Sequence, residues 1–367
     1  MAAWFIGLMS GTSLDGVDGV LAQADETSGA LRSRAHVHVD FGAELRAELL
    51  ALNRSGPDEL HRAALAAIGL VSAYSQVVHE LLKATGVDAA DVTAIGAHGQ
   101  TVRHQPRDGY TVQLMNGALL AERTGIDVVC DFRSRDVAAG GQGAPLAPGF
   151  HAAAFGAPGR ERALLNLGGI SNLSLLRADG GVLGFDCGPA NVLMDGWCQR
   201  HQGRPFDAGG AWAAGGLVDS TLLQTLLAEP YFALPPPKST GRDLFDMAWF
   251  DARLGNAARD PQAVMATLAE LTVYSVAADL KRHAPAADAL FVCGGGAFNA
   301  HLMSRLAALL PGVGVRSSAE LGVPPDQVEG MAFAWLAQAF VTRRPGNLPA
   351  VTGADGPRVL GALYPAQ

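Results

Sequence analysis

The chain lacks several features that would assign it to a common class. Its four cysteines show no C-x-x-C or other paired spacing, which argues against a cysteine zinc site and a disulfide framework. No cluster of lysine and arginine offsets the formal net charge of −8, so nucleic acid is not an expected partner. Uninterrupted apolar runs stay below roughly 18 residues, and no basic segment precedes the first one, so we expect neither a membrane span nor export. These absences predict a cytoplasmic protein with reduced thiols.

The composition indicates a well-packed protein. With 367 residues, of which 49% are hydrophobic and 17% charged, the chain is long enough for two cores, and its 45 glycines predict many turns. Such a composition excludes a disordered chain. Helical and strand spacings alternate along the sequence, which is typical of an α/β layer fold.

The most informative segment is FIGLMSGTSLDGVDGVLA, from Phe5 to Ala22. An apolar run ends in a Gly/Ser/Thr turn, passes two acids and returns as a second apolar run. The same layout recurs about half the chain later, from Ala163 to Leu176, and leads into VLGFDCGPAN. Two hairpins whose turns expose backbone N–H groups, with carboxylates beside them, predict binding of a nucleotide triphosphate and a metal ion. We therefore expect a kinase and not a binding module.

The first turn has the chemistry of a phosphate site without being a P-loop. Val17 stands where a Walker A loop needs lysine, and a strand follows the turn instead of a helix. Gly11 lets the backbone approach phosphates, and either Asp15 or Asp18 is a candidate to hold Mg²⁺ or its waters. An ordinary Ser/Gly-rich turn with solvated acids is the alternative. The residues expected to bind nucleotide here are Gly11, Thr12, Ser13, Leu14, Asp15, Gly16, Val17 and Asp18.

Asp186 is the candidate catalytic base. It follows the apolar run VLGF at the expected end of a strand, where functional groups often lie. With an ordinary pKa near 3.9, its carboxylate is ionised at neutral pH and ready to accept a proton. A helix N-cap is the alternative role, but Asp186 lies several residues before the helix expected near Asn191, and Pro189 or Ala190 fits that boundary better.

Two further glycine segments are candidates for nucleotide contact. Gly168 and Gly169 form the turn of the second hairpin, in NLGGISN. Gly294, Gly295 and Gly296 follow an apolar strand in CGGGAFN, where bare backbone lets adenine or its ribose lie flat. A simple strand-to-helix turn is the alternative, although one glycine would suffice for that.

Other polar residues give weaker signals. His98 and His104 lie six residues apart in the expected loop HGQTVRHQP, and without a third ligand at suitable spacing, hydrogen bonding is favoured over metal binding. Substrate contact by His98 or Gln100 is the functional alternative. Asp131 and Arg133 form either a structural ion pair or substrate contacts. The loop PPPKSTGRDLF, with Lys238, either neutralises an anionic ligand or is a proline-stiffened surface loop.

Taken together, MSGTSLDGVD, AHGQTVRH, DVVCDFR with AAGGQGAPL, NLGGISN, FDCGPAN, PPKSTGRD, CGGGAFN and NLPAVTGA resemble the anhydro-N-acetylmuramic acid kinases. The resemblance runs from the first strand to the last dozen residues. It implies the two-lobed, actin-like ATPase fold, with ribonuclease H-like lobes and an inter-lobe cleft for ATP and sugar. We expect a first lobe of residues 1–135 plus 345–367 and a second lobe of residues 136–344.

The resemblance also implies an activity. ATP with Mg²⁺ would phosphorylate O6 of 1,6-anhydro-N-acetylmuramic acid while the anhydro ring is hydrolysed, giving N-acetylmuramic acid 6-phosphate and ADP for peptidoglycan recycling. Asp186 would be the base, Glu329 matches a family acid near the sugar, and a homodimer is implied. The family pattern has Thr at Cys187 and Gly at Ala190, which affects local loop geometry only. A conventional hexosamine kinase that consumes no water and a non-catalytic actin-like nucleotide switch remain alternatives.

Overall fold

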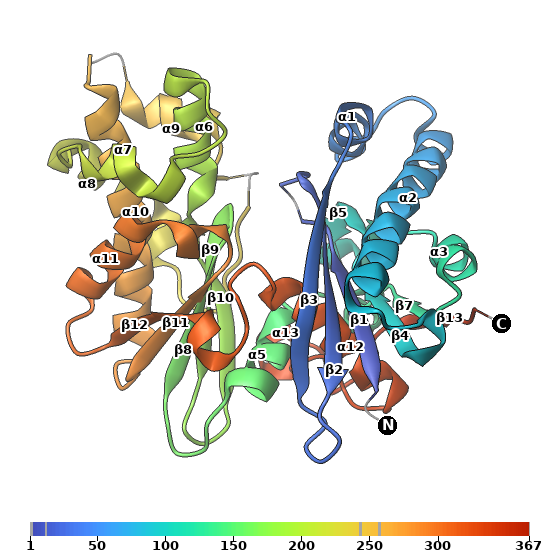
Figure 1. Cartoon of the computed structure of the whole chain (residues 1–367). Coiled ribbons are helices and arrows are strands. Elements are labelled where there is room, and N and C mark those ends of the chain that lie inside the picture. Colours follow the sequence, from blue (N-terminus) through green and yellow to red (C-terminus); the bar gives the residue numbers. More distant parts are fainter. Residues whose placement is uncertain (1–2, 12, 242–243, 256–257, 367) are drawn as a thin grey trace. The chain divides into compact units, whose positions relative to one another are not determined.

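The computed structural model describes residues 3–11, 13–241, 244–255 and 258–366. The chain divides into two compact units, one containing Met1–Ala154 and Gln327–Gln367 and the other Phe155–Asp326. In Figure 1 the first unit runs from blue to cyan-green and ends in red, and the second runs from green to orange. Each unit is a sheet with helices packed on it, which confirms the predicted α/β class.

The first unit is built on a six-stranded sheet in the order β13-β7-β4-β1-β2-β3. Consecutive strands β1, β2 and β3 pair antiparallel, whereas β4 is parallel to β1 and β7 is parallel to β4. A separate hairpin pairs β5 with β6. The strands are β1 Trp4–Met9, β2 Gly16–Ala24, β3 Leu31–Asp40, β4 Val92–Ala97, β5 Gln100–Gln105, β6 Tyr110–Leu114, β7 Val128–Cys130 and β13 Ala362–Tyr364.

The second unit repeats this topology in a five-stranded sheet, β10-β9-β8-β11-β12. Its first three strands are again an antiparallel meander, and its last two are parallel to the first. The order third-second-first-fourth-fifth in both units is the ribonuclease H-like arrangement, so the predicted duplication and actin-like fold are confirmed. The strands are β8 Arg162–Leu167, β9 Ile170–Leu176, β10 Val182–Pro189, β11 Ala289–Cys293 and β12 Gly314–Ser317.

Helices cover both faces of the first sheet. On one face, α2 (Glu59–Thr85) places Val77 against the bare backbone of Gly19. On the other, α12 (Val328–Val341) lies so close to the sheet that a Cβ atom on Gly7 would overlap the carbonyl oxygen of Gly330. Glycines at both contact points permit this approach. The remaining helices of this part of the chain are α1 Ala43–Ala51, α3 Gly117–Thr124, α4 Ser134–Ala138, α5 Ala147–Phe155 and α13 Pro349–Thr352.

The second unit is organised around α10 (Pro261–His283), which contacts β9, β10 and four other helices. By length and composition, α2 and α10 are the two described helices that could cross a membrane, and 83% of the apolar window of α10 is buried inside the structure. The apolarity of α10 is thus explained by its position in the core of this unit. The other helices here are α6 Asn191–Gln202, α7 Ala211–Ala214, α8 Ser220–Leu227, α9 Met247–Leu254 and α11 Ala300–Leu309.

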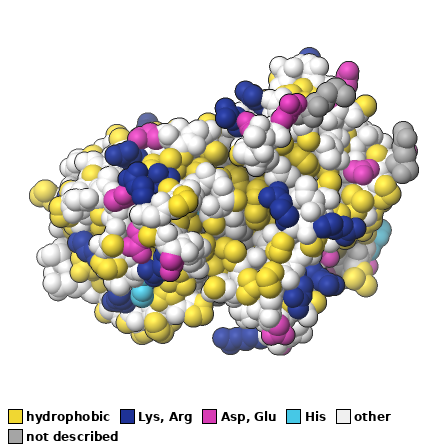
Figure 2. All heavy atoms as spheres, turned by 90° about the horizontal axis from the view of Figure 1, so that it is seen from below, with side chains coloured by type: hydrophobic (Ala, Val, Ile, Leu, Met, Phe, Trp, Pro, Cys, Tyr) yellow, Lys and Arg dark blue, Asp and Glu magenta, His cyan; other side chains and the backbone are white. Residues whose placement is uncertain are grey.

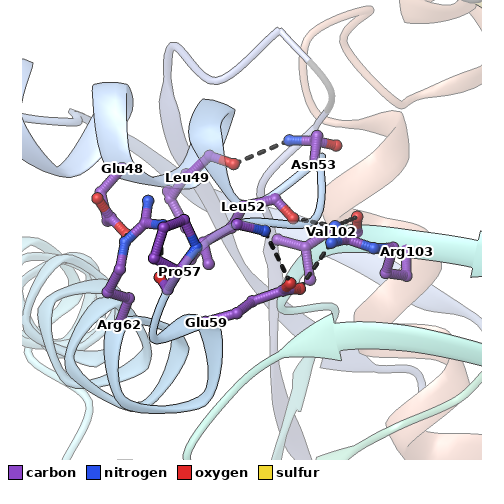
Figure 3. A network of polar contacts seen from close by, with 10 residues as sticks. Glu48, Leu49, Leu52, Asn53, Pro57, Glu59, Arg62, Val102 and Arg103 are labelled. Atoms are coloured by element: carbon purple, nitrogen blue, oxygen red, sulfur yellow. Dashed lines mark hydrogen bonds and ion pairs between the residues drawn. The ribbon is translucent and has the colours of Figure 1, made fainter.

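The segment HGQTVRHQP is not the predicted loop. Residues Gln100–Gln105 form β5. In this strand polar residues flank the buried Val102, and residues outside the strand bind the side chain of Arg103. Arg103 donates from Nη2 to Oε1 of Glu59 at 2.6 Å and from Nη1 to the carbonyl oxygen of Leu52. Figure 3 shows the side chains of Arg103 and Glu59 pointing toward each other, and Arg62 paired with Glu48 nearby. Arg103 therefore links β5 to the segment that joins α1 and α2.

The division between the units differs from the predicted boundaries. Residues 136–154 and 327–344, which the sequence assigned to the second lobe, belong to the first unit. The physical reason for the second difference is α12, whose buried face packs on β1, β2 and β4. The glycines and prolines between Arg133 and Pro148 predict a long turn or hinge, but this stretch contains α4 and the start of α5.

Surface charge is mixed. On the face shown in Figure 2, lysine and arginine side chains are interspersed with aspartate and glutamate among hydrophobic ones. Several exposed pairs are in contact, such as Arg160 with Asp288 at 2.7 Å and Arg200 with Asp251 at 2.6 Å. Exposed pairs of this kind contribute little stability, about 0–1 kcal/mol each, but they neutralise one another locally.

Candidate functional site

The turn of the first hairpin is ordered by its own polar groups. Ser13 donates its hydroxyl to Oδ1 of Asp15 at 2.7 Å, and the N–H of Gly16 donates to the same oxygen at 3.0 Å. Leu14 has a left-handed backbone, with φ of 56°, and its N–H donates to the carbonyl oxygen of Gly11 at 3.3 Å. Thr12 lies outside the described residues. The turn therefore presents the exposed side chains of Ser13 and Asp15.

Two expected nucleotide-binding residues face inward. The side chains of Leu14 and Val17 are buried in the core of the first unit. Only their backbone groups are available to a ligand. Gly16 is enclosed as well, because a Cβ atom there would overlap the backbone of Val39 on β3. Nucleotide contact at this turn therefore stays a prediction for its backbone, and the buried side chains of Leu14 and Val17 do not take part.

Asp18 is engaged by two histidines that sequence reasoning did not single out. On β3, His36 contributes Nε2 and His38 contributes Nδ1, each 3.0 Å from Oδ1 of Asp18. The other ring nitrogen of His38 lies 3.3 Å from Asp40. Burial lowers the pKa of His38, but its contacts with Asp18, Asp40 and Asp15 outweigh burial and raise the pKa overall. The histidine spacing of two along a strand was the available signal, because it places both rings on one face.

The first turn is tied to the segment after β4. The buried side chain of Gln100 donates from Nε2 to the carbonyl oxygen of Gly11 at 3.1 Å. The hydroxyl of Ser10 lies 3.0 Å from that of Tyr74 and donates to the carbonyl oxygen of Gly99 at 3.1 Å. His98 reaches the carbonyl oxygen of Ser10 through Nδ1 at 3.0 Å. The structure thus brings His98 and Gln100 to the base of this turn.

Arg133 joins this group, with Glu329 nearby. Its guanidinium donates to His98 and also to the carbonyl oxygen of Gly143 at 2.9 Å. Burial lowers the pKa of Arg133 to about 10, while the charges of Glu329 and Asp136 act in the opposite direction. Glu329 is exposed in the first turn of α12. Four of the five expected substrate residues, His98, Gln100, Arg133 and Glu329, therefore lie in one region of the first unit.

Asp131 does not pair with Arg133. It is exposed, has a left-handed backbone with φ of 56°, and accepts the hydroxyl of Ser134 at 2.5 Å. The alternative of an Asp131–Arg133 ion pair is therefore not what the structure shows, since Arg133 bonds to His98 and Gly143 instead. An exposed carboxylate at a strand end remains open to a ligand.

The turn of the second hairpin supports the start of α6. The carbonyl oxygen of Gly168 accepts the N–H of Asn191 at 3.0 Å. The carbonyl oxygen of Gly169 accepts the N–H groups of Ala190 at 2.9 Å and Val192 at 3.1 Å. Ala190 is the N-cap residue of α6, which is one of the two positions predicted from the sequence, and Asp186 does not have that role. This turn is thereby held against the first turn of a helix.

The three consecutive glycines lie beside the second hairpin. Gly294 has φ of 77°, and a Cβ atom on it would overlap Asn166 and Leu167 of β8. A Cβ atom on Gly296 would also overlap Leu167. Gly295 differs, because nothing lies within 4 Å of the position of its Cβ atom. Two of the glycines therefore serve close packing, and Gly295 is the one that leaves open backbone for a ligand.

Asp186 lies within β10 and not at its end. The pairing of β10 with β9 shifts register between Asp186 and Gly188, so a β-bulge follows the residue. Bulges are frequent next to active sites because they redirect a side chain. The N–H of Thr240 donates to Oδ2 of Asp186 at 2.9 Å, and the hydroxyl of Tyr231 donates to the Asp186 carbonyl oxygen at 2.8 Å. Sequence reasoning missed Tyr231, whose contact spans a large sequence separation.

The pKa of Asp186 is not ordinary. Burial raises it to about 6, although the Thr240 N–H and the charge of Lys238 both act to lower it. The sequence expectation of a pKa near 3.9 is therefore wrong, because that value assumes a solvated carboxylate. At neutral pH the group remains largely ionised, by about ten to one. A higher pKa also makes it a stronger base for proton abstraction.

Lys238 is not an exposed phosphate contact. Its side chain is buried and its Nζ atom lies 2.9 Å from Oδ2 of Asp279 on α10. Neither predicted role of its loop describes this residue, since it neither faces solvent nor leaves its charge unpaired. Arg242, also part of that loop, lies outside the described residues.

The donors present suit magnesium better than a transition metal. Over residues 3–11, 13–241, 244–255 and 258–366, no group of three or more His, Cys, Asp or Glu side chains is arranged to hold a metal ion alone. Magnesium commonly binds one or two carboxylates together with waters and substrate phosphates. Asp15 fits this requirement because it is exposed beside the Ser13 hydroxyl. Asp18 fits less well because two imidazoles occupy its Oδ1 atom.

The family model and the curated relatives indicate one family. The model of the family described as anhydro-N-acetylmuramic acid kinase matches residues 3–366. A protein of that name from Variovorax paradoxus is 58% identical over 99% of both chains, and one from Bordetella petrii is 60% identical over 99% of this chain and 96% of its own. A ROK family glucokinase from Streptomyces griseus, solved with glucose and AMPPNP, covers 92% of this chain and 99% of its own with a TM-score of 0.41 and 18% identity, which is too distant to indicate function. The chain belongs to the anhydro-N-acetylmuramic acid kinase family.

Proposed function

We propose that the chain uses ATP to phosphorylate O6 of 1,6-anhydro-N-acetylmuramic acid while water opens the anhydro ring. The products are N-acetylmuramic acid 6-phosphate and ADP, which places the reaction in peptidoglycan recycling and amino-sugar catabolism. The observation that carries the proposal is the position of Asp186, a carboxylate with a pKa of about 6 held at a bulge by the N–H of Thr240. A match over residues 3–366 to a kinase family named for this sugar supports it.

Asp186 acts as the base for water. Its carboxylate takes a proton as the water oxygen attacks the anomeric carbon, which develops oxocarbenium character as the bond to O6 breaks. The electron pair of that bond stays on O6, which attacks the γ-phosphorus, and ADP leaves. The proton on Asp186 then passes to solvent. One carboxylate thus assists both ring opening and phosphoryl transfer.

The glycine turns bind the nucleotide. The turn from Gly11 to Asp18, with the exposed hydroxyl of Ser13, would contact the phosphates, and Gly168 with Gly169 would supply a second glycine turn. The open backbone at Gly295, between Gly294 and Gly296, suits the nucleoside. Asp15 would hold magnesium, with Asp18 as the second candidate, and the ion when bound neutralises charge on the phosphate oxygens.

The polar residues around Arg133 in the first unit recognise the sugar. The guanidinium of Arg133 suits the carboxylate of the lactyl ether, because arginine donates two parallel hydrogen bonds to such a group. Glu329 and Asp131 are exposed acceptors for hydroxyl or amide groups. His98 and Gln100 support the site without touching the sugar, since both are buried and bond to backbone oxygens of the first hairpin.

We also propose that the enzyme acts in the cytoplasm as a homodimer. The resemblance to the family supports both statements. Light scattering coupled to size-exclusion chromatography measures the mass of the assembly, and a mass of one chain contradicts the dimer.

Product mass tests the function directly. Purified protein is incubated with ATP, Mg²⁺ and either the anhydro sugar or free N-acetylmuramic acid. We expect the anhydro sugar to gain one water and one phosphoryl group, with ADP formed in equal amount. Phosphorylation of the free sugar alone, or of the anhydro sugar without added water, would identify a conventional hexosamine kinase instead.

A further inference from the structure

The loop beside Asp186 carries a buried cation. Lys238 is one of three lysines in the chain and its side chain is only 1% exposed, while that of its partner Asp279 is 4% exposed. Its Nζ atom also lies over the rings of Tyr231 and Phe185, 5.1 and 5.8 Å from their centroids. A buried ion pair often stabilises a fold no better than an apolar pair of similar volume. Stability alone therefore does not explain why this pair is present.

The same loop fixes the backbone and the carboxylate of Asp186. β10 is the edge strand of its sheet, and the outward N–H of Asp186 donates to the carbonyl oxygen of Lys238 at 3.1 Å. Two residues later in the loop, the N–H of Thr240 donates to Oδ2 of Asp186 at 2.9 Å. The loop thus contacts Asp186 at Lys238 itself and again two residues later, so movement of Lys238 would move both contacts.

The charged and titratable groups around this contact come from three elements. Lys238 and Tyr231 belong to the segment after α8, Cys187 follows Asp186 on β10, and Asp279 and His283 lie on α10, 4.0 Å apart. Burial raises the pKa of Asp186, and the positive charge of Lys238 opposes that rise. Burial also raises the pKa of Cys187 and lowers that of His283, so both are uncharged at neutral pH.

We propose that Lys238 is a positioning residue for Asp186: paired with Asp279, it holds the loop that orients the carboxylate and brings a positive charge near it. The inference rests on the proposed role of Asp186 as base. Lys238 itself touches no reacting atom. Its partner Asp279 anchors the ammonium group on a helix buried in the core, which explains why a charge is tolerated there.

Replacing Lys238 and Asp279 by two uncharged residues removes the positive charge near Asp186 while a side chain still fills each position. Lys238→Met with Asp279→Leu is apolar and of similar volume, and Lys238→Gln with Asp279→Asn keeps neutral hydrogen bonding if the apolar pair does not fold. For the folded variant we expect the acidic limb of the kcat/KM profile to move up by about one pH unit. The ¹³C carboxyl resonance of Asp186, assigned by its loss in Asp186→Asn, should titrate higher by the same amount. Lys238→Arg should keep both wild-type values.

A second ion pair on α10 provides the matched control. Glu270 and Arg305 are 2.9 Å apart, and Glu270→Gln with Arg305→Met removes that pair without touching the loop. We expect this control variant to unfold at a lower temperature than wild type. The acidic limb of its kcat/KM profile and the titration of its Asp186 resonance should stay at the wild-type values. The proposal is overturned if uncharged Lys238 variants titrate like wild type, or if the control moves Asp186 equally. Because the resonance is followed without sugar or ATP, the inference is tested even if the proposed kinase reaction fails.

Discussion

Arg133 donates hydrogen bonds to Nε2 of His98 from both Nε and Nη2, at 3.1 and 3.0 Å. Because Nε2 accepts, the proton of the neutral ring is on Nδ1, which lies 3.0 Å from the carbonyl oxygen of Ser10. Burial and the charge of Arg133 lower the pKa of His98 to about 3, which keeps the ring neutral. A neutral histidine therefore connects the guanidinium to the backbone of the first hairpin.

Arg133→Lys should weaken binding of the sugar selectively. Lysine has no planar fork, so it cannot bond to His98 and present two donors to a carboxylate at once. We expect the KM for the anhydro sugar to rise about tenfold, the effect of losing roughly 1.4 kcal/mol, while the KM for ATP stays unchanged. Steady-state kinetics with each substrate varied measure this. The exposed Arg135→Lys on α4 is the control, and equal changes in both KM values would contradict the assignment.

Buried neutral histidines predict loss of stability in acid. Burial lowers the pKa of His98 and of His151 to about 3, below the ordinary value of 6.5. Between these values the unfolded chain binds protons that the folded chain does not, so stability is present above pH 6.5 and falls as the pH falls toward 3. The slope is up to about 1.4 kcal/mol per pH unit for each histidine. Urea unfolding at pH 7, 6 and 5 measures it.

A pair of variants isolates one histidine. His151→Gln should reduce the slope of stability against pH, because its replacement cannot titrate, whereas His79→Gln on the exposed face of α2 should not. An unchanged slope in His151→Gln would show that this residue is not the neutral group.

Strong periodicity allowed parts of the fold to be predicted closely. The apolar pattern and its flanking turn residues predict a strand at Val92–Ala97 and helices near Gly117–Thr124 and Pro261–His283, and β4, α3 and α10 have these bounds. β3 was missed and β5 was assigned as a loop. Both are largely polar strands: no residue of β3 is fully buried, and only Gln100 and Val102 of β5 are. β3 also lies at a sheet edge, where a weak hydrophobic signal is usual.

The candidate site was predictable where it depends on local motifs. The two glycine hairpins and Asp186 can be recognised in the sequence because glycine-rich turns and carboxylates occur close together there. The partners of Asp186 cannot, since Tyr231 and Thr240 reach it only through the fold. The pKa of Asp186 also depends on burial, which no single-residue pattern reveals.

Activity should fall in mild acid. The pKa of Asp186 is raised to about 6, and a base must be unprotonated to accept a proton. We expect log kcat/KM to be level at neutral pH and to decline by about one unit per pH unit below pH 6. A profile measured from pH 4.5 to 8, with enzyme stability checked at each pH, tests this. A limb near pH 4 would instead indicate a solvated carboxylate.

Asp186→Asn should abolish most turnover without disturbing the fold. The amide keeps an oxygen for the Thr240 N–H but cannot accept a proton from water. We expect kcat to fall on the order of a hundredfold or more, the usual scale for a general base, with ATP affinity retained. Calorimetric titration with ATP and product formation measure the two effects. Near-normal turnover would remove Asp186 from the mechanism.

Gly7→Ala should unfold the first unit more readily, because α12 and β1 meet at bare backbone. A Cβ atom at Gly7 would overlap the carbonyl oxygen of Gly330 and the backbone nitrogen of Ala334, neither of which can move as a flexible side chain would. Forcing the helix off the sheet should cost about 3 kcal/mol or more. Gly42→Ala is the control, since nothing lies within 4 Å of its Cβ position and its φ is −59°. Denaturant unfolding compares the two, and equal stabilities would mean that the helix lies farther from β1 than described.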